Sequence, residues 1–431
     1  MTVATDQTGA MAYPPQPLPE QFCNLGRLVD SLAARDLDGI VVTSPYNTFY
    51  LSGFKGIAHK SDEPRPYAVI LSRHQPDHPV LVVADYYVSS LLDQPTWIKD
   101  VRSFRAVMLP LDLPPGECDL DRFLPQPGLN IDWVKNARGH YADTIGVACR
   151  QALADLGLAS GRVAFDDLRF GHLLAMDSVT ITDGYDPMMY ARCVKTPAEI
   201  ELLRRATRLN EQAICTTIGQ WQRGMTWREF NHAYHRTVID LGGFVRDPGA
   251  MVWGHPCGGD RAVTLQTALE NFVVEPGLHI MFDCHGTLDL YCWDGGKTWV
   301  VDGEAAGDAR RYAEATAEAS AAVLEAMRPG VRISELQRIG RSVYSKVGVP
   351  DADAVLIFFH GLGLSHMDLE QHTSDGEPNV DWRLEDNMVV PLHILYPGDE
   401  HHRIWLEEVI RVTPDGGEAL FDWGLDPLIA T

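Results

Sequence analysis

An apolar run over residues 280–282 leads into a carboxylate, Asp283, in the stretch Ile280-Met281-Phe282-Asp283-Cys284-His285-Gly286. Eleven positions after Asp283, a second aspartate follows a second apolar run, in Tyr291-Cys292-Trp293-Asp294-Gly295. A carboxylate at the end of a buried strand is costly unless a partner compensates its charge. If the two runs are antiparallel strands of one hairpin, Asp283 and Asp294 can converge on one point. Each segment alone is equally typical of a salt-bridged aspartate or a turn before glycine.

Three further apolar segments in the C-terminal half also carry metal-ligand side chains. Phe358-Phe359-His360-Gly361-Leu362-Gly363 places an imidazole where the backbone needs glycine, although a lone histidine there is more often a hydrogen-bonded core residue. His393 ends the strand-like run 388–393, and Glu407 lies inside the apolar run 404–410. Three carboxylates and two imidazoles from buried strands are most simply satisfied by a divalent metal ion.

The rest of the chain predicts an α/β protein. In the N-terminal half, helical spacing over 25–34 leads into apolar strand candidates, which indicates a mixed sheet flanked by helices. A proline-rich stretch over 109–128 predicts a surface loop. The N-terminal strands are predicted at 39–42, 67–71, 79–83 and 162–165.

The C-terminal half predicts the order strand, strand, helix, helix, strand, strand. Thr196 and Thr226 are typical N-caps and predict a helix after each. The longest helix is predicted at 309–327, and the last two strands at 389–395 and 403–412.

Composition narrows the class of protein. The chain has 431 residues and a formal net charge of -23, so we expect two domains and repulsion from nucleic acid and anionic membranes. The charge suits a cationic or zwitterionic small-molecule substrate, and it is also an ordinary solubility feature. No run approaches the roughly 20 apolar residues of a membrane-spanning helix, and residues 1–20 do not have the pattern of a signal peptide. We therefore expect a cytoplasmic protein with reduced cysteines.

The order and spacing of the site segments resemble the pita-bread family of creatinase, methionine aminopeptidase, aminopeptidase P and prolidase. Asp283, Asp294, His360 and Glu407 match four of that family's five metal ligands. The resemblance implies a flexible arm over 1–20, a creatinase-like domain over 21–185 and a pita-bread catalytic domain over 186–431. It also implies a homodimer.

His393 departs from the family pattern, because a glutamate ligand is expected at its position. The exchange makes the site less anionic, so we expect one ion, with a second one less favoured, held by Asp294, His360, His393 and Glu407. Iron, zinc and manganese all accept such a shell. Asp283 is a further ligand or the remnant of a second site. His285 could join the shell, support it from behind or lie in an exposed turn.

Two histidines that the peptidases of the family use are also missing. Met367 stands where a catalytic histidine is expected, and the other expected position falls in the segment 264–267, which lacks histidine. The branch of the family that cleaves dimethylsulfoniopropionate shows a similar loss and has an acidic catalytic residue where this chain has His366. That branch keeps the glutamate that His393 replaces, so the likeness is partial.

Candidate catalytic and substrate-binding residues follow from these departures. His366 is the best candidate base, since imidazole exchanges protons near neutral pH, with Asp368 as an alternative. Aromatic faces can hold a sulfonium or ammonium group, which makes Trp253 and Trp293 candidate substrate contacts, although such residues are more often core. His255 is a further candidate contact in a predicted loop.

The sequence therefore predicts a metal-dependent enzyme that cleaves a small zwitterionic or amino-acid-like molecule, as a non-peptidase lyase or a C–N hydrolase. The first alternative is an Xaa-Pro-type aminopeptidase or dipeptidase. The second is a protein that has lost catalysis and serves as a binding module, which the retention of four ligand positions disfavours.

Overall fold

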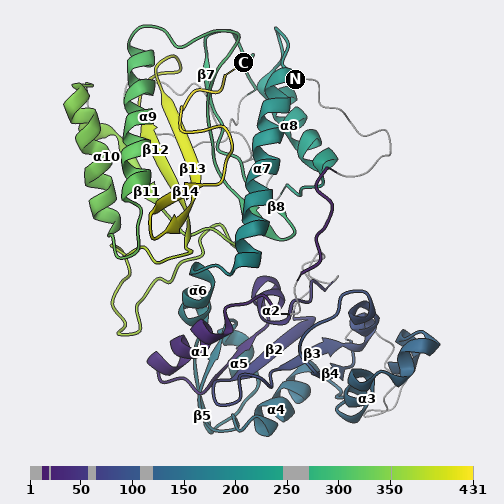
Figure 1. The fold of residues 1–431 in the computed structure, drawn as a ribbon. Helices are drawn as coiled ribbons and strands as arrows, with labels where there is room; N and C mark the ends of the chain where they lie inside the picture. The colour runs from purple at the N-terminus through teal and green to yellow at the C-terminus, as the bar shows by residue number, and fades with distance from the viewer. Residues whose placement is uncertain are drawn as a thin grey trace. The chain divides into compact units, whose positions relative to one another are not determined.

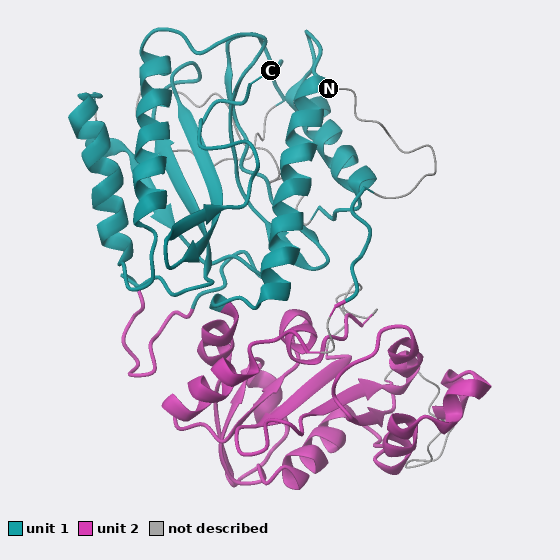
Figure 2. Ribbon diagram, viewed as in Figure 1, with its two compact units in different colours: residues 1–17, 193–369, 380–431 teal, residues 18–192, 370–379 magenta. Residues whose placement is uncertain are grey.

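The structure, a computed structural model of the whole chain, describes residues 12–18, 21–56, 65–106, 120–245, 271–350 and 352–430. The chain divides into two compact units (Figure 2). The N-terminal unit comprises residues 18–192 and 370–379, and the C-terminal unit comprises residues 1–17, 193–369 and 380–431. Most of the predicted arm lies outside the described residues. Within it, the Tyr13 amide donates to Leu241 O at 3.2 Å, so this part of the arm packs on the C-terminal unit.

The N-terminal unit contains a six-stranded mixed sheet in the order β4-β3-β2-β1-β5-β6, as predicted. The pairs β3–β4, β1–β5 and β5–β6 are parallel, and β1–β2 and β2–β3 are antiparallel. Its strands and helices are α1 (Leu25–Ala34), β1 (Gly39–Val42), α2 (Pro45–Ser52), β2 (Tyr67–Ser72), β3 (Val80–Ala84), η2 (Asp85–Leu92), β4 (Asp100–Phe104), η3 (Leu120–Phe123), η4 (Gln126–Asn130), α3 (Asp132–Gly139), α4 (Ile145–Asp155), β5 (Gly161–Phe165), α5 (Leu168–Leu173), β6 (Val179–Asp183) and α6 (Tyr185–Cys193).

Two strands of this sheet, β4 and β6, were not predicted from the sequence. Both are edge strands, and edge strands carry charged and polar side chains that break an apolar run. The described part of the predicted loop over 109–128 contains the short 3-10 helices η3 and η4, so it is more ordered than a plain loop.

The C-terminal unit is built on an antiparallel sheet in the order β11-β12-β13-β10-β7, with β14 paired to β13 and a separate β8–β9 hairpin. The prediction of two strands, two helices and two strands is therefore incomplete, because, in the described part of the chain, four strands precede the helix pair and four follow it. Its elements are α7 (Pro197–Gly219), α8 (Trp227–Leu241), β7 (His279–Met281), β8 (Gly286–Leu288), β9 (Tyr291–Trp293), β10 (Gly296–Val300), α9 (Asp308–Ala326), α10 (Ile333–Val347), η5 (Ala352–Ala354), β11 (Leu356–Phe359), β12 (Val389–Tyr396), β13 (Ile404–Thr413) and β14 (Gly416–Ala419).

Two pairs of helices cover this sheet (Figure 1). Helices α7 and α8 share a buried core with β7 and β10, and α9 and α10 share another with β11, β12 and β13. The predicted caps are confirmed, since Thr196 and Thr226 each form a capping box with the glutamate three residues later. No helix in the described part of the chain is both long and apolar enough to cross a membrane.

The two aspartate segments pair differently from the predicted hairpin. The run before Asp294 is β9, and β9 pairs with β8 instead of with β7. Strand β7, which precedes Asp283, pairs with β10, which begins two residues after Asp294. The β8–β9 hairpin is therefore inserted between two neighbouring strands of the sheet. Both aspartates consequently lie where β7 ends and β10 begins.

Candidate metal centre

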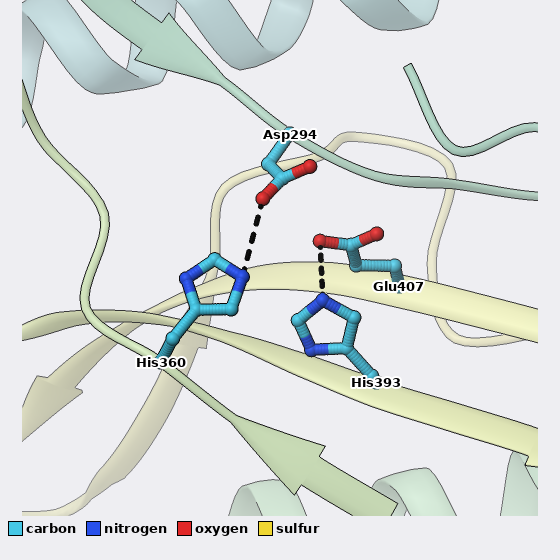
Figure 3. A group of neighbouring side chains, drawn as sticks. All are labelled: Asp294, His360, His393 and Glu407. Atoms are coloured by element: carbon cyan, nitrogen blue, oxygen red, sulfur yellow. Dashed lines mark ion pairs between the residues drawn. The ribbon is translucent and has the colours of Figure 1, made fainter. Parts of the chain in front are cut away.

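Four buried side chains from separate strand segments converge in the C-terminal unit (Figure 3). Asp294 follows β9 and His360 follows β11, while His393 and Glu407 lie within β12 and β13. One donor atom from each of the four lies within 4.8 Å of the others. Carboxylate oxygens and imidazole nitrogens at this spacing are typical ligands of a divalent transition metal.

The glycines after Asp294 allow this convergence. Gly295 has a φ of +88°, a left-handed conformation that a side chain disfavours. A Cβ on Gly295 would lie only 2.8 Å from Glu407 Cγ. The backbone beside Asp294 can therefore approach β13 closely enough for the two carboxylates to face one centre.

Most of the ligand atoms at this centre lie close to one another and have no hydrogen-bond partner. His360 Nε2 lies 3.3 Å from Asp294 Oδ2, and His393 Nε2 lies 2.8 Å from Glu407 Oε1. Even so, Asp294 Oδ2, His360 Nε2 and both Glu407 carboxylate oxygens are buried with no hydrogen bond of proper geometry. Buried polar atoms are normally satisfied. Atoms that point at a shared position are what a metal site requires, so these residues fit a divalent ion.

Backbone carbonyls orient both imidazoles. His360 Nδ1 lies 3.0 Å from Gly361 O, and His393 Nδ1 lies 3.2 Å from Phe358 O. A ring whose Nδ1 donates to a carbonyl presents an unprotonated Nε2, the form that binds metal. The ring of Phe358 also stacks on that of His393, with centroids 4.1 Å apart. Each imidazole is therefore fixed with Nε2 toward the centre.

Burial and mutual charge shift the pKa values of the site. Burial, followed by the charges of Asp294 and Asp283, raises the pKa of Glu407 well above its ordinary value. Burial, followed by the charge of His360, lowers the pKa of His393 well below its ordinary value. Burial alone would raise the pKa of Asp294, but the charge of His285 and the contacts of His360 and His366 hold it well below its ordinary value. A divalent cation would relieve the carboxylate repulsion and use the neutral form of His393.

A second group of side chains shares Asp294 with the first. His285 Nε2 lies 2.8 Å from Asp283 Oδ1 and 3.1 Å from Asp294 Oδ1. His366 Nε2 lies 2.9 Å from Asp294 Oδ2, and the rings of His285 and His366 stack with centroids 4.7 Å apart. The His285 and His366 side chains are 25% and 44% exposed. The structure therefore brings all six predicted ligands and His366 together, and places His285 and His366 on the open side of the site.

Two predicted site residues, Trp293 and Asp368, are buried in the protein interior. Trp293 is fully buried in the core between α7, α8 and the sheet, so its ring offers no surface to a substrate. Asp368 is buried in an ion pair, with Lys195 Nζ 3.2 Å from its Oδ2, and it is not available as a base. Met367 is half exposed. Trp253, His255 and residues 264–267 lie outside the described residues.

The sequence interpretation missed Lys195 and the aromatic residues that support His393. The ring of Trp405, on the neighbouring strand β13, lies edge-on to the His393 ring, with centroids 5.8 Å apart. Nothing in the sequence pairs Lys195 with Asp368, because a single lysine before a helix cap is an ordinary surface pattern.

Comparisons with known proteins agree with this architecture. The profile of metallopeptidase family M24 matches residues 201–414, and that of the creatinase/prolidase N-terminal domain matches residues 25–171. An uncharacterized peptidase of Staphylococcus aureus (strain MSSA476) is 26% identical over 231 residues, which cover 53% of this chain. The match spans 62% of the length of that relative.

Solved structures share the fold at low sequence identity. A prolidase from Pyrococcus furiosus superposes with a TM-score of 0.63 at 17% identity, covering 91% of this chain and 98% of its own. An X-Pro aminopeptidase from Thermotoga maritima gives 0.63 at 18% identity, covering 94% and 99%. The predicted fold, a creatinase-like domain followed by a pita-bread domain, is confirmed. The chain belongs to metallopeptidase family M24.

Proposed function

We propose that this protein is a divalent-metal-dependent hydrolase that cleaves an amide C–N bond in a dipeptide-sized, amino-acid-like substrate. The observation that carries the proposal is the convergence of Asp294, His360, His393 and Glu407, in which buried ligand atoms of Asp294, His360 and Glu407 have no hydrogen-bond partner. Membership in family M24 supports metal-dependent hydrolysis, and the prolidase and X-Pro aminopeptidase likeness favours a short peptide over the lyase reaction that the sequence interpretation placed first.

The residues divide the work between binding and proton transfer. A divalent ion held by the four residues would act as a Lewis acid on the substrate carbonyl and would acidify water. We assign proton transfer to His366, because its Nε2 lies 2.9 Å from Asp294 Oδ2 while its ring stays partly exposed. Asp283 accepts from His285 and so holds a second imidazole at the same opening. Iron, zinc and manganese all suit the mixed shell.

β-Elimination from a sulfonium or ammonium acid is the second candidate. The specific observation in its favour is that Met367, half exposed, stands where a peptidase of this family would have a histidine, while the neighbouring His366 contacts Asp294. An elimination needs one base beside the carbon that loses its proton and no donor for a leaving amine.

The homodimer and the cytoplasmic location stay predictions.

One experiment separates these proposals. The purified full chain is stripped with a chelator, reloaded with Mn²⁺, Zn²⁺, Fe²⁺ or Co²⁺, and analysed for bound metal. It is then assayed against a panel of Xaa-Pro and other dipeptides, and against dimethylsulfoniopropionate with acrylate as the product. Release of free amino acids supports the hydrolase, and acrylate supports the lyase. Failure to bind any of the four metals would overturn the metalloenzyme proposal and leave the binding-module alternative.

A further inference from the structure

The loop that connects His360 to His366 is wrapped around a buried carboxylate, that of Asp368. The amides of Leu364 and Ser365 both donate to this carboxylate at 3.2 Å. The Asp368 amide donates back to Gly361 O at 3.0 Å. Asp368 therefore bonds to both the beginning and the end of the loop.

Lys195 supplies the countercharge from a distant part of the sequence. Its Nζ lies 3.2 Å from Asp368 Oδ2, and the exposed fractions of the two side chains are 0% and 1%. Its own amide donates to Asn387 O at 2.9 Å, which ties it to the turn before β12. An ion pair this deeply buried holds its geometry, because water cannot replace either partner.

Close contact with the Lys195–Asp368 ion pair explains why two positions of the loop are glycine. A Cβ on Gly361 would overlap the Asp368 backbone, and a Cβ on Gly363 would overlap the Asp368 carboxylate and lie 2.8 Å from Lys195 Nζ. The loop can therefore close around Asp368 only with glycine at both positions. The His-Gly-x-Gly pattern in this chain reflects contact with the ion pair as well as contact with a ligand.

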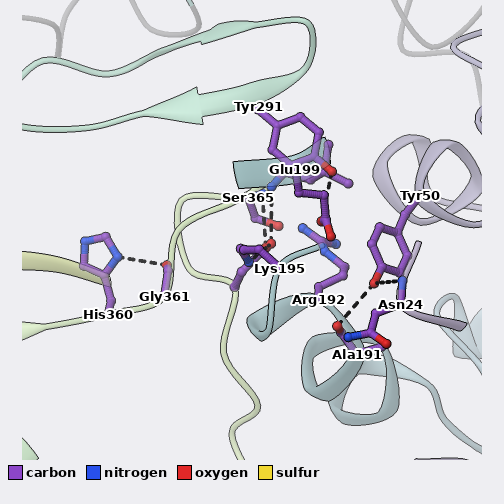
Figure 4. Close-up of polar contacts among 12 residues, drawn as sticks. Asn24, Tyr50, Ala191, Arg192, Lys195, Glu199, Tyr291, His360, Gly361 and Ser365 are labelled. Carbon is purple, nitrogen blue, oxygen red and sulfur yellow. Dashed lines mark hydrogen bonds and ion pairs between the residues drawn. The ribbon is translucent and has the colours of Figure 1, made fainter. Parts of the chain in front are cut away.

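The same network reaches the strand that precedes Asp294. The Cys292 amide of β9 donates to Gly363 O at 2.8 Å. The neighbouring Tyr291 hydroxyl donates to Glu199 at 3.0 Å, and Lys195 lies close enough to that buried carboxyl to oppose the rise that burial causes in its pKa. Figure 4 shows Lys195, Glu199 and Tyr291 beside the chain that runs from His360 through Gly361 to Ser365.

We infer that Lys195 and Asp368 form a positioning pair that sets the loop 361–367, and through it the imidazoles of His360 and His366. Neither residue is assigned a catalytic role, since the ammonium group and the carboxylate are buried against each other. The pair acts by fixing the loop that connects the predicted ligand His360 to the predicted base His366. For its catalytic consequence, this inference rests on the proposed function. The loop geometry itself does not.

Hydrogen–deuterium exchange of the full chain tests the inference directly, with the peptide that covers residues 360–368 as the readout. We expect Lys195→Met and Asp368→Asn to accelerate exchange in this peptide by at least about tenfold, because the loop amides lose their compensated acceptor. A peptide from α9 should exchange as in the wild type. The double variant should match Asp368→Asn alone in this peptide, since the lysine acts on the loop through the Asp368 carboxylate.

A matched control removes the basic member of another ion pair in the same unit. Arg205 lies 3.3 Å from Asp289, with side chains 10% and 5% exposed, and neither residue belongs to the loop. Arg205→Met should lower stability without accelerating exchange over 360–368. Loop exchange within about twofold of the wild type in Lys195→Met, or equal acceleration in Arg205→Met, would overturn the inference.

A spectroscopic measurement separates this inference from the proposed function. The visible absorption of bound Co²⁺ reports the geometry of its ligands, so a displaced His360 should shift and weaken the bands in Lys195→Met but not in Arg205→Met. If the wild type binds no Co²⁺, the proposed function fails, and exchange in the metal-free protein still decides the positioning role. If the wild type binds Co²⁺ and both Lys195→Met readouts are unchanged, the inference alone fails.

Discussion

His393 and Glu407 stand directly opposite each other on the antiparallel strands β12 and β13, with 2.8 Å between His393 Nε2 and Glu407 Oε1. Side chains opposite each other in an antiparallel pair lie on the same face of the sheet. The register of two strands therefore places an imidazole at a site where the family resemblance implies a carboxylate. The donor set thereby has one charge fewer, which bears on metal choice.

His393→Glu should change metal preference. Restoring a carboxylate adds a hard, charged donor, so binding of Mn²⁺ should strengthen relative to that of Zn²⁺. His393→Ala should weaken binding of both ions by more than the roughly 10- to 100-fold that loss of an outer partner costs. Competitive titration of the two ions with a metal indicator measures both effects. An unchanged Mn²⁺/Zn²⁺ ratio in His393→Glu would show that His393 is not a ligand.

His366→Ala should reduce turnover while keeping the metal. Loss of a general acid–base group costs about 10²- to 10⁴-fold in rate, whereas the four buried ligands remain in place. Metal content by mass spectrometry and steady-state rates on whichever substrate is turned over give the two numbers. Loss of metal along with activity would instead make His366 a ligand. Exposed His372, at 53% side-chain exposure, provides the matched control.

Metal removal should lower thermal stability. An ion that binds the folded chain at a free concentration about 100 times its Kd adds about 2.7 kcal/mol to the free energy of unfolding. The gain arises because buried Glu407 and Asp294 then have a partner for their charges. Differential scanning calorimetry with and without a chelator checks it. Glu407→Gln should abolish the difference, and a difference that persists in this variant contradicts the assignment.

Trp293→Phe should destabilise the protein without affecting substrate binding. The indole is fully buried between α7, α8 and the sheet, so a smaller ring leaves a cavity that costs about 1–3 kcal/mol. Urea unfolding followed by tryptophan fluorescence measures the loss. A raised KM with unchanged stability would instead support the direct contact between Trp293 and the substrate that the sequence suggested.

Glu418 should contribute stability only above its own titration range. Burial opposes its ionisation, but Arg204 and Arg411 hold its pKa below the ordinary value of 4.5. A carboxyl whose pKa is lowered on folding stabilises fully above the unfolded value, and the effect is lost as pH falls through the folded value. Glu418→Gln should therefore lower the Tm by at most about 3 °C at pH 7, since the pair is partly exposed. Calorimetry from pH 7 to pH 3.5 should show this difference shrinking below about pH 4.5. A constant difference would contradict the ion-pair interpretation.

Much of the fold could be predicted because local patterns carry it. The capping threonines, the helix over 309–327 and the strands around His393 and Glu407 all follow from apolar spacing and cap chemistry, and all are present. Contrary to the prediction, the helix over 309–327 is not the longest, since α7 has 23 residues and α9 has 19. The edge strands β4 and β6 could not be found in this way, because their charged and polar residues gain strand structure from a neighbour.

The sequence by itself determined which chemical groups the site contains, because the order and spacing of aspartates, histidines and glutamate are written along the chain. Only the tertiary structure decided how they are used. Strand pairing separated β9 from β7, buried Trp293 in the core, and set His393 against Glu407. It also brought Lys195 to Asp368 across 173 positions of sequence, so that the carboxylate of a predicted base is buried in an ion pair. Such contacts depend on strand register and on burial, and neither is a property of a local segment.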